Sequence, residues 1–335
     1  MAATIHDVAR LAGVAISTVS KVMSDSPRIS ALTKNRVREA MQQLNYHPSR
    51  HARGLARNCT ETLGVLMPLR RNSAFQNPYV FEILCGIERH CASQHYSVML
   101  LDAEALASKP KAVQQLVAER KVDGVILHAD LHAPQLIRQF TALALPFVVI
   151  GRQPGHHSWV DVDNVHAGEI ATAHLLAQGY QHLQFIGNHL HDTISADRLQ
   201  GFLRALESQH LQPCAPPLYA QAGHYAEGLG LWARLQQLPM RPDAIVVAGN
   251  PLAAGVMAAA QADGIRIGYE LGIVSFDEYP YAEQTQPPLS VVDIDLFALG
   301  EQAAREWFLQ WNKPTHCSQS LLLDQRLLVR ASSSR

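Results

Sequence analysis

The sequence predicts an α/β protein in two unequal parts: a small all-α unit at the N-terminus and a larger body of parallel β-sheets flanked by helices. The first sixty residues space their apolar side chains as helices do, whereas after Cys59 short β-rich runs alternate with helical stretches. The chain has 335 residues, about two to three domains by length, so it can bury a sizeable core.

Composition and charge exclude several classes of protein. Apolar residues make up 47% of the chain and charged residues 17%, which excludes a disordered or collagen-like chain. The charge is unevenly distributed, because residues 1–58 carry nine basic and three acidic side chains, which leaves a net charge of −7 on the remainder. A basic segment attached to an acidic body predicts that the N-terminal part binds a polyanion.

Cysteines and hydropathy indicate the compartment. The five cysteines are odd in number and include no Cys-x-x-Cys pair, so neither a disulfide framework nor a zinc finger is indicated. No apolar run reaches the length of a membrane span, and the first residues lack the apolar segment of a signal peptide. We therefore expect a cytoplasmic protein, located with the nucleoid, that has no membrane partner.

Two short helices are expected on either side of Gly13. The first is indicated by apolar residues at helical spacing, namely Ile5, Val8, Ala9 and Ala12. The second would bury Val19, Val22 and Met23. Two short helices around a glycine turn make a helix-turn-helix. A third helix, with its N-cap at Ser30, would complete a small domain over residues 1–46, followed by a linker over residues 47–60.

The second helix carries the side chains expected to read DNA, since a recognition helix needs groups near its N-terminus that reach base edges in the major groove. Lys21 can donate to guanine, Ser17 can serve several bases, and Ile16 can pack against a thymine methyl. Hydroxyl groups around them are expected to contact phosphates. The predicted DNA-binding residues of this unit are Thr4, Ile16, Ser17, Thr18, Ser20, Lys21, Ser30, Thr33 and Tyr46.

These residues stand in segments that resemble a known family. TIHDVARLAGVAISTVSKVM, then RIS, then RVREAMQQLNYHPSRHARGLAR is similar to the DNA-binding headpiece of the LacI/GalR family of bacterial transcription regulators. One position departs from the family, because Ala15 stands where Ser or Thr is usual and forfeits an N-cap worth about 1 kcal/mol. The resemblance implies a homodimer on a pseudo-palindromic DNA operator, with one headpiece per half-site.

The resemblance extends to the hinge that follows the headpiece. In the family this segment forms a helix in the DNA-bound dimer and pushes a leucine into the minor groove. Leu55 occupies that leucine's place, and Arg53 is expected to contact DNA beside it. About eight residues are too few for a stable isolated helix, so the hinge should fold only on its operator. An ordinary flexible linker is the alternative interpretation.

The body resembles the family's effector-binding core, a two-lobed fold similar to periplasmic sugar-binding proteins. Its β-rich runs are residues 63–68, 97–102, 124–129, 147–151, 183–187, 244–249 and 271–276, and their alternation with helices predicts parallel sheets. In that fold the chain crosses between lobes three times, here expected near Asp161, Leu289 and Leu321. Residues 61–335 then divide into a first lobe of about 61–160 and 290–320 and a second lobe of about 161–289 and 321–335.

Effector-binding residues are expected just after these strands, because ligands of open parallel sheets bind beyond the carboxyl ends of the strands. The candidates are Phe75, Tyr79, His128 and Arg152 in the first lobe and Arg198, Tyr225, Asn250 and Asp277 in the second. The resemblance most strongly supports Arg198 and Asp277, for which a structural ion pair is the alternative. For the three aromatic residues the alternative is core packing. Charged groups, hydrogen-bonding groups and aromatic rings together suit a sugar.

Rival functions are disfavoured on the same sequence. The chain contains no G-x-S-x-G, P-loop or G-x-G-x-x-G motif, so we expect no catalysis and no cofactor. No metal is expected either, because His128 and His132 have the spacing of a helical metal pair but fall in an expected loop. A periplasmic-type sugar-binding protein would fit the core but not the headpiece.

The ligand itself stays open between two classes. Where the family often has Ala-Asn-Asp, this chain has Ala248, Gly249 and Asn250, which prevents any carry-over of a particular ligand. We expect a repressor that a small sugar-type effector releases from its operator. A purine- or nucleoside-responsive regulator, with the ligand as corepressor, is the closer alternative, because aromatic side chains stack on bases as they do on sugars.

Overall fold

The computed structural model describes residues 3–23, 26–46, 59–67, 69, 78–109, 111–129, 133–153, 155–190, 192–221, 223–278, 280–313 and 318–335. By its contacts the chain divides into two compact units, Met1–Glu61 and Thr62–Arg335. Each unit has its own hydrophobic core.

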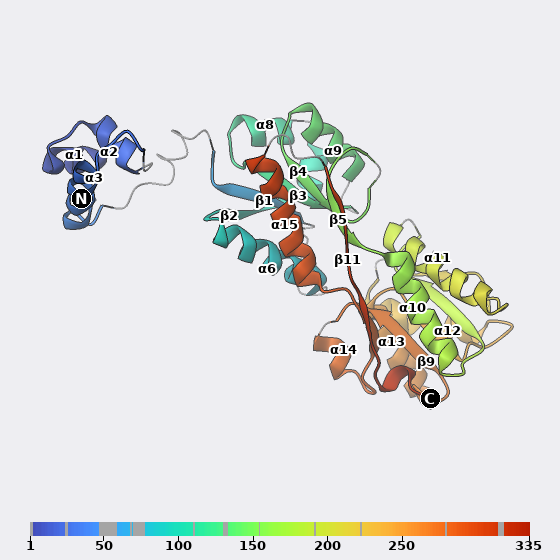
Figure 1. The fold of residues 1–335 in the computed structure, drawn as a ribbon. Coiled ribbons are helices and arrows are strands. Elements are labelled where there is room, and N and C mark those ends of the chain that lie inside the picture. Colours follow the sequence, from blue (N-terminus) through green and yellow to red (C-terminus); the bar gives the residue numbers. More distant parts are fainter. Residues whose placement is uncertain are drawn as a thin grey trace. The chain divides into compact units, whose positions relative to one another are not determined.

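The N-terminal unit contains three short helices, α1 (Ile5–Ala12), α2 (Ile16–Met23) and α3 (Ala31–Gln43) (Figure 1). They enclose a small core around the fully buried Val8, Val19 and Val37. Gly13 ends α1 with a φ of 61°, a left-handed conformation that favours glycine, and turns the chain into α2. The predicted helix-turn-helix is therefore confirmed.

Side-chain caps fix two of these helices. Thr4 caps α1 in a reciprocal capping box with Asp7, and Ser30 caps α3 by accepting a hydrogen bond of 3.3 Å from the backbone N–H of Thr33. The N-cap predicted at Ser30 is confirmed. Before α2, the carbonyl of Ala15 accepts the backbone N–H groups of Thr18 and Val19, but alanine has no hydroxyl to add a cap of its own.

The first lobe of the larger unit is built on a six-stranded parallel sheet with strand order β11-β5-β4-β3-β1-β2. Its strands are β1 (Thr62–Met67), β2 (Ser97–Asp102), β3 (Gly124–His128), β4 (Phe147–Ile150), β5 (Trp159–Val162) and β11 (Ser320–Leu323). Helices α6 (Pro78–Ser93) and α15 (Leu296–Asn312) cover one face. Helices α7 (Ala103–Ser108), α8 (Ala112–Ala118) and α9 (Ala133–Ala142) cover the other.

The second lobe repeats this plan on a sheet of order β12-β10-β9-β8-β6-β7, in which only β12 runs antiparallel. Its strands are β6 (Leu183–Gly187), β7 (Leu218–Tyr219), β8 (Ala244–Val247), β9 (Gly272–Phe276), β10 (Ser290–Asp293) and β12 (Arg326–Leu328). Helices α10 (Asn164–Ala177) and α11 (Thr193–Ser208) pack on one face. Helices α12 (Tyr225–Gln236) and α13 (Asn250–Ala262) pack on the other.

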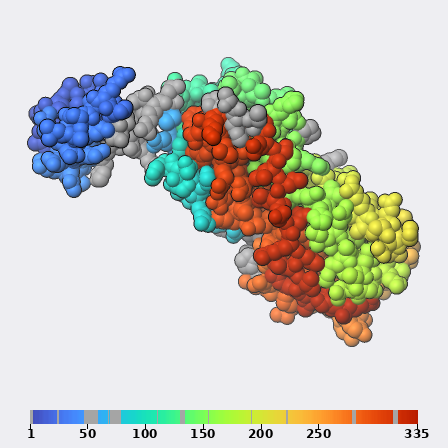
Figure 2. Space-filling view, in the orientation of Figure 1, coloured from blue at the N-terminus to red at the C-terminus, as the bar shows by residue number. Residues whose placement is uncertain are grey.

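All seven strands predicted in the body are present, and two of the three expected crossings shift. The crossing expected near Leu321 falls after Leu323, because β11 pairs with β5 and so belongs to the first lobe. The crossing expected near Leu289 falls after Asp293, because β10 pairs in parallel with β9 and so belongs to the second lobe, not the first. Residues 290–293 are therefore assigned to the second lobe. The C-terminal segment extends across both lobes in the space-filling view, since β11 joins the first sheet and β12 the second (Figure 2).

Helices α10 and α11 approach each other closely at glycines, and this contact positions the start of α11. A Cβ atom on Gly201 would overlap the carbonyl oxygen of Val165, and one on Gly168 would overlap that of Arg198. We therefore expect Gly201→Ala to lower the free energy of unfolding by about 1–3 kcal/mol, because the two helices must separate. Urea denaturation of the full-length protein measures this.

The matched control is Gly230→Ala on α12. A Cβ atom there meets nothing within 4 Å, so the substitution should raise stability by about 0.5–1 kcal/mol through helix propensity alone. If both substitutions changed the midpoint equally, the close packing of α10 on α11 would have no energetic weight.

Candidate functional site

The outer face of α2 presents the predicted DNA readers to solvent. Ile16 is 40% exposed, and Ser17, Ser20 and Lys21 are exposed as well, whereas Val19 and Val22 are buried against the other helices. Thr18 is half-buried between these two faces. The helix thus offers the apolar, hydroxyl and cationic groups that base edges in a major groove can use.

The candidate phosphate contacts already hold local structure. The Thr4 hydroxyl donates to Asp7 over 2.7 Å, and the hydroxyls of Ser30 and Thr33 lie 3.0 Å apart. Tyr46 is half-buried against the core of the helical unit. Their role on DNA stays a prediction. The predicted hinge residues Arg53 and Leu55 lie outside the described residues.

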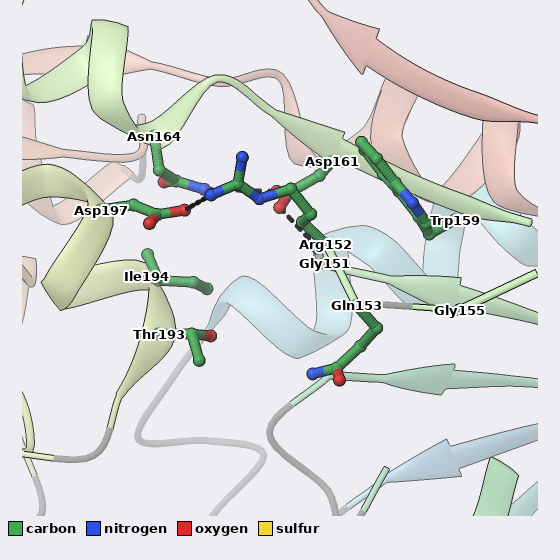
Figure 3. Close-up of a pocket in the computed structure, with 10 residues that line it drawn as sticks. All are labelled: Gly151, Arg152, Gln153, Gly155, Trp159, Asp161, Asn164, Thr193, Ile194 and Asp197. Atoms are coloured by element: carbon green, nitrogen blue, oxygen red, sulfur yellow. Dashed lines mark hydrogen bonds and ion pairs between the residues drawn. The ribbon is translucent and has the colours of Figure 1, made fainter. Parts of the chain in front are cut away.

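A pocket of about 560 Å³ opens between the two lobes of the core. It is lined by the β4–β5 connection, by β5 itself and by the starts of α10 and α11 (Figure 3). The lining residues are Gly151, Arg152, Gln153, Gly155, Trp159, Asp161, Asn164, Thr193, Ile194 and Asp197. Of the eight predicted effector residues, Arg152 lines this pocket.

Arg152 connects the lobes at this pocket. Its guanidinium Nη2 lies 3.0 Å from Oδ2 of Asp197 on α11, and its backbone N–H donates to Oδ2 of Asp161 over 2.7 Å (Figure 3). The Arg152 side chain is 58% exposed, so solvent weakens the ion pair, while the hydrogen bond of its backbone N–H holds the main chain in place.

Asp161 stands at the end of β5, where the chain leaves the first lobe. Its Oδ1 accepts hydrogen bonds from the backbone N–H of Val162 over 2.7 Å and from the amide of Asn164 over 3.3 Å. Burial raises the pKa of Asp161, and these backbone bonds, with the nearby charges of His128 and Arg198, oppose that rise. Asp161 is therefore held in place from both lobes.

Arg198 is buried behind the pocket and has a partner at every guanidinium nitrogen. Nε donates to Asn164 over 3.0 Å and Nη1 to the carbonyl of Ala248 over 2.8 Å. Nη2 lies 3.6 Å from Oδ1 of Asp277, and the guanidinium carbon lies 4.0 Å from the centre of the Phe276 ring. The planar guanidinium is thus fixed by hydrogen bonds at its edge and by a cation–π contact on its face.

Asp277 follows β9 in a left-handed conformation with a φ of 70°. Its backbone N–H donates to Val292 over 2.9 Å, and its carbonyl accepts the side-chain amide of Asn250 over 2.8 Å. Strained backbone of this kind concentrates at functional sites. The other amide atom, Oδ1 of Asn250, is buried and has no hydrogen-bond partner among the described residues.

Tyr79 and His128 pair with each other in the first lobe. The Tyr79 hydroxyl lies 2.7 Å from Nε2 of His128, and the two rings meet edge to face. His128 ends β3 and acts electrostatically on Asp161. Hydrogen bonds and an ion pair connect Arg152, Asp161, Asn164, Arg198, Asp277 and Asn250 in one polar network.

Of the other predicted effector residues, Tyr225 stays apart from this network. Tyr225 begins α12, is 48% exposed and is not among the residues that line the pocket. Phe75 lies outside the described residues, as does His132. Sequence reasoning missed Asp161, Asn164, Trp159 and Asp197 as site residues; the motif Asp-Val-Asp-Asn at the end of β5 was the available signal for the first two.

Among the described residues, no three histidine, cysteine or acidic side chains lie close enough to hold a metal ion. No helix in that part of the chain is long and apolar enough to cross a bilayer.

A DNA-reading helical unit and a two-lobed core with an interlobe polar site define the class: a ligand-responsive regulator of transcription. Two family models match the chain accordingly. Residues 4–49 match the bacterial regulatory proteins of the lacI family, and residues 172–333 match a periplasmic binding protein-like domain.

Curated relatives extend over most of the chain. The transcriptional repressor PurR of Actinobacillus pleuropneumoniae is 29% identical over 98% of both chains. The transcriptional regulator MalR of Streptococcus pneumoniae is 34% identical over 76% of this chain and 79% of its own. This protein belongs to the lacI family of bacterial regulatory proteins, and it is a DNA-binding regulator of transcription.

A solved structure agrees with the fold. The Lac repressor dimer bound to operator and the anti-inducer ONPF superposes with a TM-score of 0.85 at 24% identity, covering 99% of each chain. The predicted two-lobed core behind a helix-turn-helix headpiece is confirmed.

Proposed function

We propose that this protein is a homodimeric repressor that holds a pseudo-palindromic operator and is released from it by a small sugar. The observation that carries the proposal is the polar network between the lobes, which reaches from Arg152 in the first lobe to Asp277 in the second. A ligand that bonds to both ends of this network favours one arrangement of the lobes. The protein works in the cytoplasm, without catalysis, on double-stranded DNA.

The chemistry of the pocket supports a sugar. Trp159 offers an aromatic face, and the planar polar groups of Gln153, Asn164 and Asp161 stand around the same space. Sugars are held by such pairings, since ring C–H groups pack on the aromatic face and hydroxyls exchange hydrogen bonds with planar carboxylates and amides. The volume of about 560 Å³ admits a mono- or disaccharide.

Operator binding and effector binding are expected to oppose each other through the hinge. The effector changes the orientation of the two lobes relative to each other, and this orientation sets the spacing of the hinge segments. Effector and operator therefore weaken each other's binding affinity by the same factor. A dimer is required because one headpiece makes few base contacts, whereas two linked headpieces make the second contact effectively intramolecular.

The effector class is tested by thermal stabilisation of the full-length protein against mono- and disaccharides, purines and nucleosides. A ligand at a hundredfold excess over its Kd should stabilise the core by about 2.7 kcal/mol. A sugar that raises the Tm supports the proposal. If only a purine or nucleoside raised the Tm, the effector would be a nucleobase compound and the proposed sugar effector would be wrong.

The DNA-reading role of α2 is tested by Lys21→Ala. Loss of the exposed ammonium should weaken operator binding and relax the preference at one base position by about 1–3 kcal/mol. Arg57→Ala in the hinge, by contrast, should weaken binding to all DNA about equally. Selection from a random-sequence duplex pool measures both profiles, and identical profiles would refute Lys21 as a base reader.

A further inference from the structure

The two arginine side chains of the site already pair with acceptor groups of the protein. Arg198 gives its three guanidinium nitrogens to Asn164, Ala248 and Asp277. Arg152 pairs with Asp197 across the pocket. An anionic group on a ligand would therefore compete with Asp197 for Arg152 and with Asp277 for Arg198.

Among the described residues of the pocket and of the polar network beside it, Asp161, Asp197 and Asp277 accompany two guanidinium groups, those of Arg152 and Arg198. The imidazole of His128, which lies near Asp161, is engaged by the Tyr79 hydroxyl. A phosphate brings a charge of about −1.5 to −2, which these carboxylates would repel.

Carboxylate and amide oxygens at the site can accept hydrogen bonds, beside the donor groups of Gln153, Trp159 and Thr193 that line the pocket. The side-chain N–H of Asn250 donates to the Asp277 carbonyl. Its Oδ1 is buried, has no hydrogen-bond partner among the described residues and can accept one from a ligand. The carboxylates also only accept when ionised. A ligand that presents O–H donors matches this polarity.

We propose that the effector is an uncharged, unphosphorylated sugar, and that Asp197 is the specificity-determining residue that excludes phosphorylated ones by occupying Arg152. This inference rests on the sugar effector proposed above and narrows its class. Asp197 acts at the pocket itself, because it lines the cavity and holds the Arg152 guanidinium at 3.0 Å.

The test is isothermal titration of the full-length protein with matched pairs: D-glucose and its 6-phosphate, D-ribose and its 5-phosphate, maltose and its 6′-phosphate. For the pair that binds, the free sugar should bind at least about tenfold more tightly than its phosphate. In Asp197→Asn, which removes the charge and keeps the side-chain size, that ratio should fall at least about fivefold because Arg152 becomes available to the phosphate.

The control variant is Glu169→Gln. Glu169 also pairs with an arginine of α11, since its Oε1 lies 3.5 Å from Arg204, but it does not line the pocket. The same carboxylate-to-amide change there should leave the ratio unaltered. If Glu169→Gln lowered the ratio as much as Asp197→Asn does, the effect would come from the net charge of the protein. Asp197 would then not be a specificity-determining residue.

The outcomes separate this inference from the proposed function. Equal binding of a free sugar and its phosphate to the native protein would overturn the inference and leave a sugar-responsive regulator. An unchanged ratio in Asp197→Asn would overturn the part assigned to Asp197. If none of the six compounds binds, the sugar effector itself is contradicted, and the inference falls with it.

Discussion

Replacing Arg198 by alanine is expected to leave a repressor that still binds its operator and no longer responds to effector. The side chain is buried and connects Asn164, Ala248 and Asp277, so its loss separates the first-lobe end of the network from the second-lobe end. The headpiece is a separate compact unit and keeps its own core. Operator affinity with and without the sugar found by thermal screening measures the effect.

Arg198→Ala also leaves the Asp277 carboxylate buried without its cation, a change that costs about 3–5 kcal/mol in other proteins. Arg198→Lys keeps the positive charge but loses the planar fork, so it should fold and bind the sugar at least about tenfold more weakly. Arg204→Ala is the matched control on the same helix, since Arg204 is 55% exposed and pairs with Glu169 at the surface. A normally inducible Arg198→Lys would place Arg198 outside the effector site.

Val37→Asn is expected to abolish operator binding and leave effector binding intact. Val37 is fully buried between the three short helices, and an unpartnered amide there, with the lost packing, should cost about 3 kcal/mol. A three-helix core this small has little stability to lose. Fluorescence anisotropy on an operator duplex and titration with the sugar measure the two activities separately.

Leu32→Asn is the matched control for that variant. Leu32 lies on the same helix and is 82% exposed, so the same amide there meets solvent and should leave the headpiece folded. Retained operator affinity in Val37→Asn would contradict the dependence of DNA binding on this three-helix core. Loss of sugar binding in Val37→Asn would contradict the independence of the core.

The parts of the fold that periodicity could predict are those with strong local patterns. Helix α2 separates buried Val19 from exposed Ser20, and the predicted bounds of β2 and β6 match those observed because each is a compact β-rich run between turns. Strand β10 escaped prediction because its four residues begin with Ser290 and end with Asp293, which look like turn residues in isolation.

The site was predictable only in part, because its geometry depends on contacts between distant segments. Arg198 and Asp277 were expected from the family resemblance, and the structure places their side chains 3.6 Å apart. Nothing local to Asp197 signals that it faces Arg152, which is 45 residues away in the chain. Tyr225 was also expected at the site, and it is not among the residues that line the pocket.

The most direct test of ligand-controlled DNA binding is an anisotropy titration of the full-length protein on an operator selected from a random-sequence pool. The titration is made with and without a saturating concentration of the sugar found by thermal screening. We predict that the sugar lowers operator affinity about 5- to 150-fold, a coupling of about 1 to 3 kcal/mol. An operator affinity that the sugar leaves unchanged or raises would contradict release by the effector.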